Sequence, residues 1–132
     1  MADFKKAWAI TSRIEAGYTN NSKDAGKETY RGISIVNNPD WLGWEVVHST
    51  IAKLGISSTL DAAKDVYAEI DKALADNPYI DGMVQTLYKK RYWDILNLDN
   101  EASQELANKT FDIAVNMGVG AARKAYQDSQ DA

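Results

Sequence analysis

Three side chains that could carry out acid–base chemistry lie close together near the start of the chain: Glu15, Asp24 and Thr29. Hydrolysis of a glycosidic bond uses one carboxylic acid to protonate the leaving oxygen. A second carboxylate, or a water held by that carboxylate and a hydroxyl, then meets the positively charged sugar carbon. If the chain folds these side chains around one cleft, their types therefore indicate a glycosidase.

Glu15 is the candidate for the acid because of its place on the first predicted helix. Apolar residues recur at helical spacing over residues 3–16, and Glu15 continues the row that contains Phe4 and Trp8. It lies in the last predicted turn, where the helix dipole disfavours a negative charge by about 0.3–1 kcal/mol. Both effects predict a raised pKa, which a general acid needs near neutral pH. The alternative is an ordinary surface glutamate at a frayed helix end.

The residues after this helix must form a turn that brings the three side chains together. Gly17 lets the chain leave the helix, and the polar residues 20–22 favour a turn. Residues 29–35 alternate enough to predict a short strand. We therefore expect an active loop and hairpin over residues 17–33.

Two motifs in this region resemble those of glycoside hydrolase family 108. They are Glu-x-Gly-Tyr-x-Asn from Glu15 and Asp-x-Gly-x-x-Thr-x-x-Gly-Ile from Asp24. The family contains bacterial and phage muramidases, some described as secretion-activating proteins, and implies a mainly α, lysozyme-like α+β fold. The chain departs from the family pattern at Ala16 and Lys27, where glycine is usual. These departures bear on the loop conformation, because glycine reaches positive φ easily and lysine does not.

The resemblance implies a muramidase that hydrolyses the β-1,4 bond between N-acetylmuramic acid and N-acetylglucosamine in peptidoglycan. Glu15 would be the general acid, and Asp24 the second carboxylate, acting on water or stabilising positive charge. Thr29 would position the water or orient Asp24. Four further side chains are expected to contact the substrate: Tyr18, Asn20, Trp41 and Trp93. For both tryptophans, packing in an aromatic core is the alternative to contact with a sugar.

Helical periodicity continues through most of the remaining chain. It predicts helices over residues 41–54, 60–75 and 101–117, one from Pro78 into residue 94, and one that begins at residue 121. Asp3 and Asn77 are expected N-caps. Gly118 and Gly120 are expected to end the helix before them. We therefore expect a helical bundle with one short β-hairpin or extended loop near the active site.

Two later segments also resemble the family. Residues 88–94 match its Tyr-x-x-x-Tyr-Trp element, which ends the catalytic half. Residues 111–118 resemble the Phe-Asp-x-Ala-Val-Asn-x-Gly signature of its predicted peptidoglycan-binding region. The resemblance thus implies one lysozyme-like domain over residues 1–132, with a catalytic half at 1–94 and a helical peptidoglycan-binding-like region at 95–132. Relatives usually continue with more helix, so this chain is either a short version or truncated.

Composition limits the other functions. A length of 132 residues is enough for one compact domain. The net charge of −4 gives no steering towards polyanions, which argues against nucleic-acid binding and mildly against a cell-wall substrate. There is no cysteine, and His48 is the only histidine, which predicts a structural role for His48 and no metal site. We expect no cofactor.

The beginning of the chain bears on where it acts. It has no apolar signal region, and no apolar run is long enough to cross a bilayer. We therefore expect synthesis in the cytoplasm and action in the periplasm or at the cell wall, after release through a holin or a non-Sec secretion partner.

Two alternatives to an enzyme remain open: a module that binds peptidoglycan or a partner without cutting, and a helical interaction protein.

Overall fold

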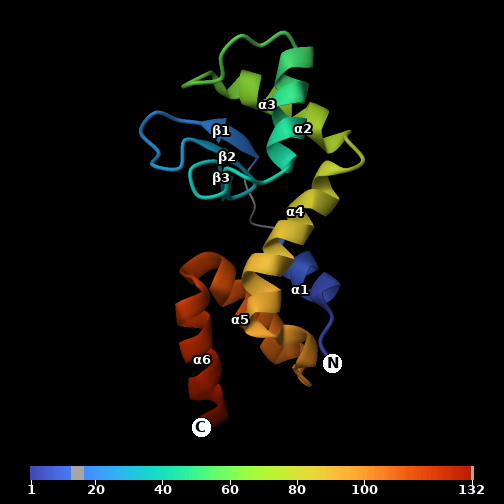
Figure 1. Ribbon diagram of the computed structural model, residues 1–132, viewed down its shortest axis with the longest axis vertical. Helices are drawn as coiled ribbons and strands as arrows, with labels where there is room; N and C mark the ends of the chain where they lie inside the picture. Colours follow the sequence, from blue (N-terminus) through green and yellow to red (C-terminus); the bar gives the residue numbers. More distant parts are fainter. Residues whose placement is uncertain (13–16, 132) are drawn as a thin grey trace. The chain divides into compact units, whose positions relative to one another are not determined.

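The computed structural model describes residues 1–12 and 17–131 of the chain. It is mainly helical with a small antiparallel sheet, which confirms the predicted fold class (Figure 1). The strands are β1 (Tyr18–Asn20), β2 (Glu28–Tyr30) and β3 (Ile33–Ser34). The α-helices are α1 (Phe4–Thr11), α2 (Gly43–Lys53), α3 (Lys64–Ala75), α4 (Ile80–Tyr88), α5 (Gln104–Met117) and α6 (Val119–Asp131). The chain forms two compact units, Glu15–Val84 and, together, Met1–Ile14 with Gln85–Ala132.

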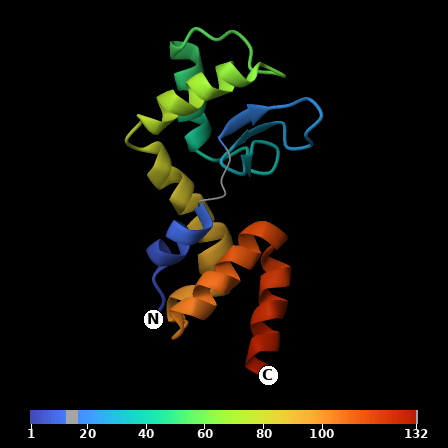
Figure 2. The ribbon, with the colours of Figure 1, turned by 180° about the vertical axis from the view of Figure 1, so that it is seen from behind.

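The unit Glu15–Val84 is built on the sheet, whose strands lie in the order β1-β2-β3. Figure 2 shows the blue hairpin of this sheet from behind. Tyr18 of β1 pairs with Tyr30 of β2, and both rings are buried. The ring of Tyr18 also packs edge-on against Tyr67 of α3, with centroids 5.8 Å apart. The sheet therefore buries one face against helix α3, and its antiparallel strands confirm the predicted hairpin within residues 17–33.

The helices of this unit are positioned by caps and indole hydrogen bonds. The amide oxygen of Asn77 accepts from the backbone N–H groups of Tyr79 and Ile80, which confirms the predicted cap of α4. At the start of α2, the rings of Trp41 and Trp44 meet edge to face with centroids 5.4 Å apart. Gly43 is required between them, because a Cβ there would overlap the ring of Trp41.

Helix α3 begins at Lys64, so the prediction of a helix from residue 60 is wrong at its start. Asp61 has a left-handed backbone (φ 52°), which no helix continues. Its N–H donates to the carbonyl of Asn20 on β1 at 2.7 Å. The segment 59–63 is therefore held as a turn against the sheet instead of joining the helix.

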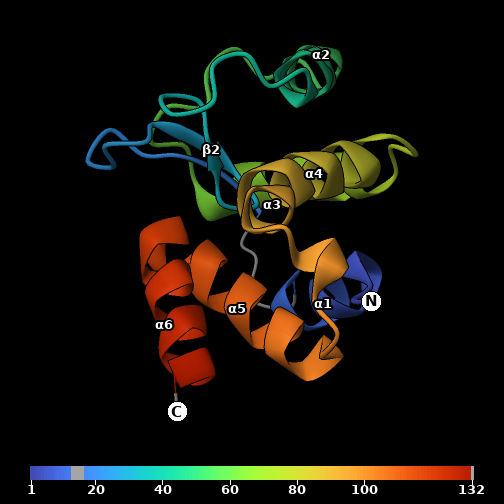
Figure 3. The same ribbon diagram turned by 60° about the horizontal axis from the view of Figure 1, so that its bottom comes forward.

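The other unit packs α1, α5 and α6 around aromatic side chains. Asp3 caps α1 by accepting from the N–H of Lys5, as predicted. Figure 3 shows α5 and α6 side by side, in agreement with their direct contacts. Helix α5 starts at its cap, Ser103. Gly118 ends α5 with φ 99°, but Gly120 lies inside α6, so the prediction that both glycines interrupt the helix is wrong for Gly120.

The segment that resembles the Tyr-x-x-x-Tyr-Trp element continues α4 as a π-helical turn, Lys89–Trp93. This wider turn is followed by the 3₁₀ turns Asp94–Leu96 and Leu98–Asn100. The side chain of Trp93 is 0% exposed and packs edge-on against Phe4 and Phe111. The segment therefore supplies the centre of this unit's core.

Candidate active site

Asp24, in the loop of the hairpin, and Thr29, on β2, both lie close to Gly26. Asp24 Oδ1 accepts from the N–H of Gly26 at 2.9 Å, and the hydroxyl of Thr29 donates to the carbonyl of Lys27 at 3.1 Å. A Cβ added to Gly26 would lie 3.5 Å from Asp24 Oδ1 and 3.4 Å from Thr29 Oγ1. The hairpin thus brings two of the three predicted catalytic side chains to one place. The third, Glu15, lies outside the described residues.

The strand register separates the predicted site residues onto two faces of the sheet. Thr19 pairs with Thr29, whereas Asn20 pairs with Glu28 and Tyr18 with Tyr30. Because side chains alternate along a strand, Thr29 and Thr19 share one face and Tyr18 and Asn20 share the other. The structure therefore does not place Tyr18 and Asn20 beside Thr29.

The two tryptophans predicted to contact substrate are core residues. Trp41 is 9% exposed, and its indole N–H donates to the carbonyl of Met83 at 3.3 Å. Trp93 is 0% exposed, and its indole N–H donates to Asp99 at 2.7 Å. A ring without an open face cannot stack on a sugar, so we correct both assignments to packing in the core.

A chain of hydrogen bonds occupies the face that Tyr18 shares with Asn20. The hydroxyl of Tyr18 donates to Glu28 Oε1 at 2.8 Å and lies 2.8 Å from Thr59 Oγ1. Because Tyr18 has one proton and gives it to Glu28, Thr59 must donate to Tyr18. The amide of Asn20 donates to Thr59 at 3.0 Å, so the chain runs from Asn20 to the carboxylate. Burial raises the pKa of Tyr18, which keeps its proton in this chain.

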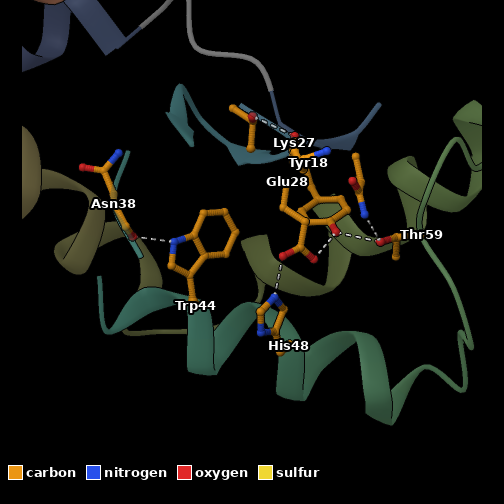
Figure 4. Close-up of polar contacts among 9 residues, drawn as sticks. Tyr18, Lys27, Glu28, Asn38, Trp44, His48 and Thr59 are labelled. Atoms are coloured by element: carbon orange, nitrogen blue, oxygen red, sulfur yellow. Dashed lines mark hydrogen bonds and ion pairs between the residues drawn. The ribbon is translucent and has the colours of Figure 1, made fainter. Parts of the chain in front are cut away.

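His48 completes this polar group from α2, as Figure 4 shows. Its Nε2 lies 2.8 Å from Glu28 Oε2, so an ionised Glu28 requires Nε2 to carry the proton. Its ring stacks on Trp44, with centroids 5.8 Å apart. No local pattern in the sequence points to this pair, because His48 and Glu28 are 20 positions apart and belong to different elements.

Asp71 on α3 fixes the chain just after the predicted acid. Its Oδ1 accepts from the N–H of Tyr18 at 2.7 Å. A Cβ on Gly17 would collide with the same carboxylate, which explains the glycine in the Glu-x-Gly-Tyr motif. Burial raises the pKa of Asp71, although the N–H of Tyr18 acts in the opposite direction.

We expect the Asp71→Asn variant to become more stable relative to the wild type as the pH rises from about 3 to 7. A carboxyl group whose pKa is raised by folding favours the folded state only while it is protonated, so this contribution is lost on ionisation. Asparagine keeps an oxygen for the N–H of Tyr18 and carries no charge. Urea denaturation at several pH values measures the difference. Glu69→Gln, on an exposed position of α3, is the matched control for removing one negative charge. A pH-independent difference for Asp71→Asn would contradict the prediction.

Lys27 stands where the family usually has glycine, and its backbone is left-handed, with φ 56°. We expect Lys27→Gly to stabilise the protein by up to about 1.5 kcal/mol. A left-handed backbone costs a residue other than glycine about 1–2 kcal/mol, and glycine removes this cost. Glycine itself loses about 0.5–1 kcal/mol through the greater entropy of its unfolded chain, and the difference is the expected gain. Urea denaturation measures the change. Lys23→Gly, at another exposed position of the same loop, has only the entropy cost of glycine and should lower the stability of the protein. A loss of stability in both variants would contradict the prediction.

Among the described residues, neither a metal site nor a membrane-spanning helix is found. Within residues 1–12 and 17–131, no cluster of three or more His, Asp or Glu side chains is arranged to hold a metal ion. The helices in the described part of the chain are all too short or too polar to span a membrane.

Comparison with known proteins identifies the family. The family model described as glycosyl hydrolase 108 matches residues 8–118 of the 132-residue chain. The match includes Glu15, Asp24 and Thr29. No curated protein and no solved structure matches the chain. Because the matched region is most of the sequence, we conclude that the chain belongs to the glycosyl hydrolase 108 family, a family of glycosidases.

Proposed function

We propose that the protein is a peptidoglycan hydrolase of the lysozyme type, which cleaves the β-1,4 bond between N-acetylmuramic acid and N-acetylglucosamine. The family match over residues 8–118 carries this proposal, since it spans the motifs that hold Glu15, Asp24 and Thr29. The described geometry supports it, because the side-chain oxygens of Asp24 and Thr29 both lie close to Gly26.

In the proposed mechanism, Glu15 protonates the glycosidic oxygen as the bond to the sugar carbon breaks. Asp24 lies at an exposed position of the hairpin, where its carboxylate can stabilise the positive sugar or activate a water. The hydroxyl of Thr29 is held by the carbonyl of Lys27, and its oxygen keeps lone pairs that can accept a hydrogen bond from that water. The acid, the carboxylate and the hydroxyl would thus each carry out a separate part of the reaction.

Asp71 has a supporting part in this mechanism. It holds the N–H of Tyr18, three residues after Glu15, and excludes any side chain at Gly17. Asp71 therefore holds Gly17 and Tyr18, the residues that follow the segment of the predicted acid, in one position. Orientation of catalytic groups contributes strongly to rate. We therefore assign Asp71 as a positioning residue, not as a group that touches substrate.

The site of action follows from the substrate. Peptidoglycan lies outside the cytoplasmic membrane, so the protein would act in the periplasm or at the cell wall. We propose that it reaches the wall after holin-type release or through a non-Sec secretion partner.

Analysis of the cleaved bond tests the proposal. Purified sacculi are digested with the protein, the new ends are reduced with borohydride, and the fragments are identified by mass spectrometry. A muramidase leaves N-acetylmuramic acid at the reducing end, so reduced muramitol ends are expected. Glucosaminitol ends would show cleavage of the other glycosidic bond. Retention on sacculi without any new reducing ends would overturn the proposal in favour of a binding module.

A further inference from the structure

A pocket of about 320 Å³ opens on the face of the sheet opposite Thr29. Its walls come from Asn20 and Glu28 of the hairpin, from His48 on α2 and from the segment 56–60. In Figure 4, Glu28 points from the sheet towards His48, with Tyr18 and Thr59 beside it. The pocket lies wholly within the unit Glu15–Val84 and has no part in the mechanism proposed above.

The polar wall of this pocket is preorganised. Glu28 receives a hydrogen bond from Tyr18 on one carboxylate oxygen and from His48 on the other. Each carboxylate oxygen can accept two hydrogen bonds, so Glu28 keeps capacity for hydroxyl groups of a ligand. Its side chain is 18% exposed and His48 is 47% exposed, so both can be reached from solvent. The wall therefore offers a fixed acceptor beside an imidazole and the amide of Asn20.

Another part of the pocket lining is apolar. Ile51 and Ala52 near the end of α2 and Ile56 and Leu60 of the following segment line it. Leu60 is 56% exposed, so its side chain is accessible to another molecule. The segment carrying Leu60 is rigid, because the hydroxyl of Tyr67 donates to the carbonyl of Thr59 at 2.8 Å. A ligand here would need hydroxyl groups on one side and a methyl or C–H face on the other.

The charges of the pocket lining further limit the kind of ligand that can bind. The lining contains the carboxylate of Glu28 but no lysine or arginine. An anionic group would lie near the carboxylate of Glu28 without a lysine or arginine to pair with, so the pocket disfavours phosphates and carboxylates. Its volume lies at the small end of the range for ligand pockets, about 300–1,000 Å³, which is the scale of one sugar ring.

We propose that this pocket binds one neutral acetamido sugar, an N-acetylglucosamine unit of a glycan strand, on the face away from Asp24 and Thr29. Glu28 and Asn20 receive and donate the hydrogen bonds of the ring, and Ile51, Ile56 and Leu60 cover the acetyl methyl group. N-acetylmuramic acid is excluded by its lactyl carboxylate, which would face Glu28. The choice of a glycan as ligand rests on the proposed function; the position and the preference for a neutral sugar rest on the pocket.

Residue-resolved NMR titration with the two monosaccharides tests this proposal. N-acetylglucosamine should shift the amide signals of His48, Ile51, Ile56 and Leu60 in a saturable way. N-acetylmuramic acid should shift them much less at the same concentration. Equal shifts with both sugars would overturn the charge argument. An absence of shifts, or shifts caused only by a stem peptide, would overturn the assignment of a sugar.

Two leucine variants supply the control. Leu60→Asp places a second carboxylate at the pocket wall and should remove the N-acetylglucosamine shifts. Leu42→Asp changes a leucine that is 68% exposed on the same unit and does not line the pocket, so it should keep them. Both side chains are mostly exposed, and a dispersed amide spectrum confirms that each variant is folded. If Leu60→Asp keeps the sugar shifts, the pocket is not the binding site.

Hydrolysis of sacculi is measured separately on the same samples. Sugar binding without new reducing ends would leave the pocket proposal standing and overturn the proposed enzyme. New muramitol ends without sugar binding would support the proposed enzyme and overturn the pocket proposal. The two failures are therefore distinguishable.

Discussion

Replacing Glu15 by glutamine is expected to abolish clearing of purified peptidoglycan. Glutamine has nearly the same shape but no proton to give to the leaving oxygen, and general acid catalysis is typically worth about 10²–10⁴-fold in rate. The melting temperature should stay the same or rise, because the sequence predicts that this carboxylate lies beside apolar side chains at the end of a helix, where a charge is costly. Loss of turbidity measures the rate, and calorimetry measures the stability.

Glu45→Gln is the matched control for this variant. Glu45 lies in the first turn of α2 and is exposed, so its replacement removes one carboxylate without touching the motif region. It should clear the wall at the wild-type rate. Asp24→Asn should cost less activity than Glu15→Gln if Asp24 only orients water, and an equal loss would make Asp24 an essential partner. A Glu15→Gln variant that still clears the wall would show that Glu15 is not the acid.

The elements that sequence reasoning placed correctly are those with local signals. Asp3 and Asn77 cap their helices because a short polar side chain before a periodic run can accept the first free N–H groups. The hairpin follows from Gly17 and the polar turn after it. Asp24 and Thr29 both lie near Gly26, since five residues of a tight turn can hardly separate them, but their catalytic roles stay a prediction.

The parts that could not be predicted depend on contacts between distant segments. Nothing near Glu28 in the sequence points to His48, because only the packing of α2 against the sheet brings the two together. The late start of α3 is a similar case, since its apolar periodicity is outweighed by the bond from Asp61 to Asn20. Strand register also decides which face a side chain takes, and a shift of one residue would exchange Glu28 and Thr29.

The substrate contacts predicted for Trp41 and Trp93 are wrong for a different reason: residue type and spacing do not distinguish a core ring from a sugar-binding ring. Both are aromatic residues at helical spacing, and both kinds of site use large apolar rings. Trp93 was expected to contact substrate, whereas it fills the core beside Phe4 and Phe111. Only burial separates the two roles, and burial is a property of the folded chain.

Trp93→Ala is therefore expected to destabilise the unit Met1–Ile14 with Gln85–Ala132, by about 3–5 kcal/mol. The ring is fully buried, its centroid lies 5.5 Å from that of Phe4, and its indole N–H donates to Asp99 at 2.7 Å. Such a loss is a large part of the usual total of about 5–15 kcal/mol, so near-UV circular dichroism and the melting temperature should both fall clearly. Trp93→Phe should cost less, because it keeps most of the apolar volume and loses the hydrogen bond.

Tyr79→Ala is the control for removing an aromatic ring from the surface. Tyr79 is 72% exposed, so its replacement should change the stability by no more than about 0.5 kcal/mol. The decisive comparison is between stability and activity. If Trp93 is a core residue, the melting temperature of Trp93→Ala falls and activity declines with the folded fraction. A variant that keeps its melting temperature but loses affinity for glycan would restore Trp93 as a substrate contact, since only a ring that meets the sugar can affect binding without affecting the core.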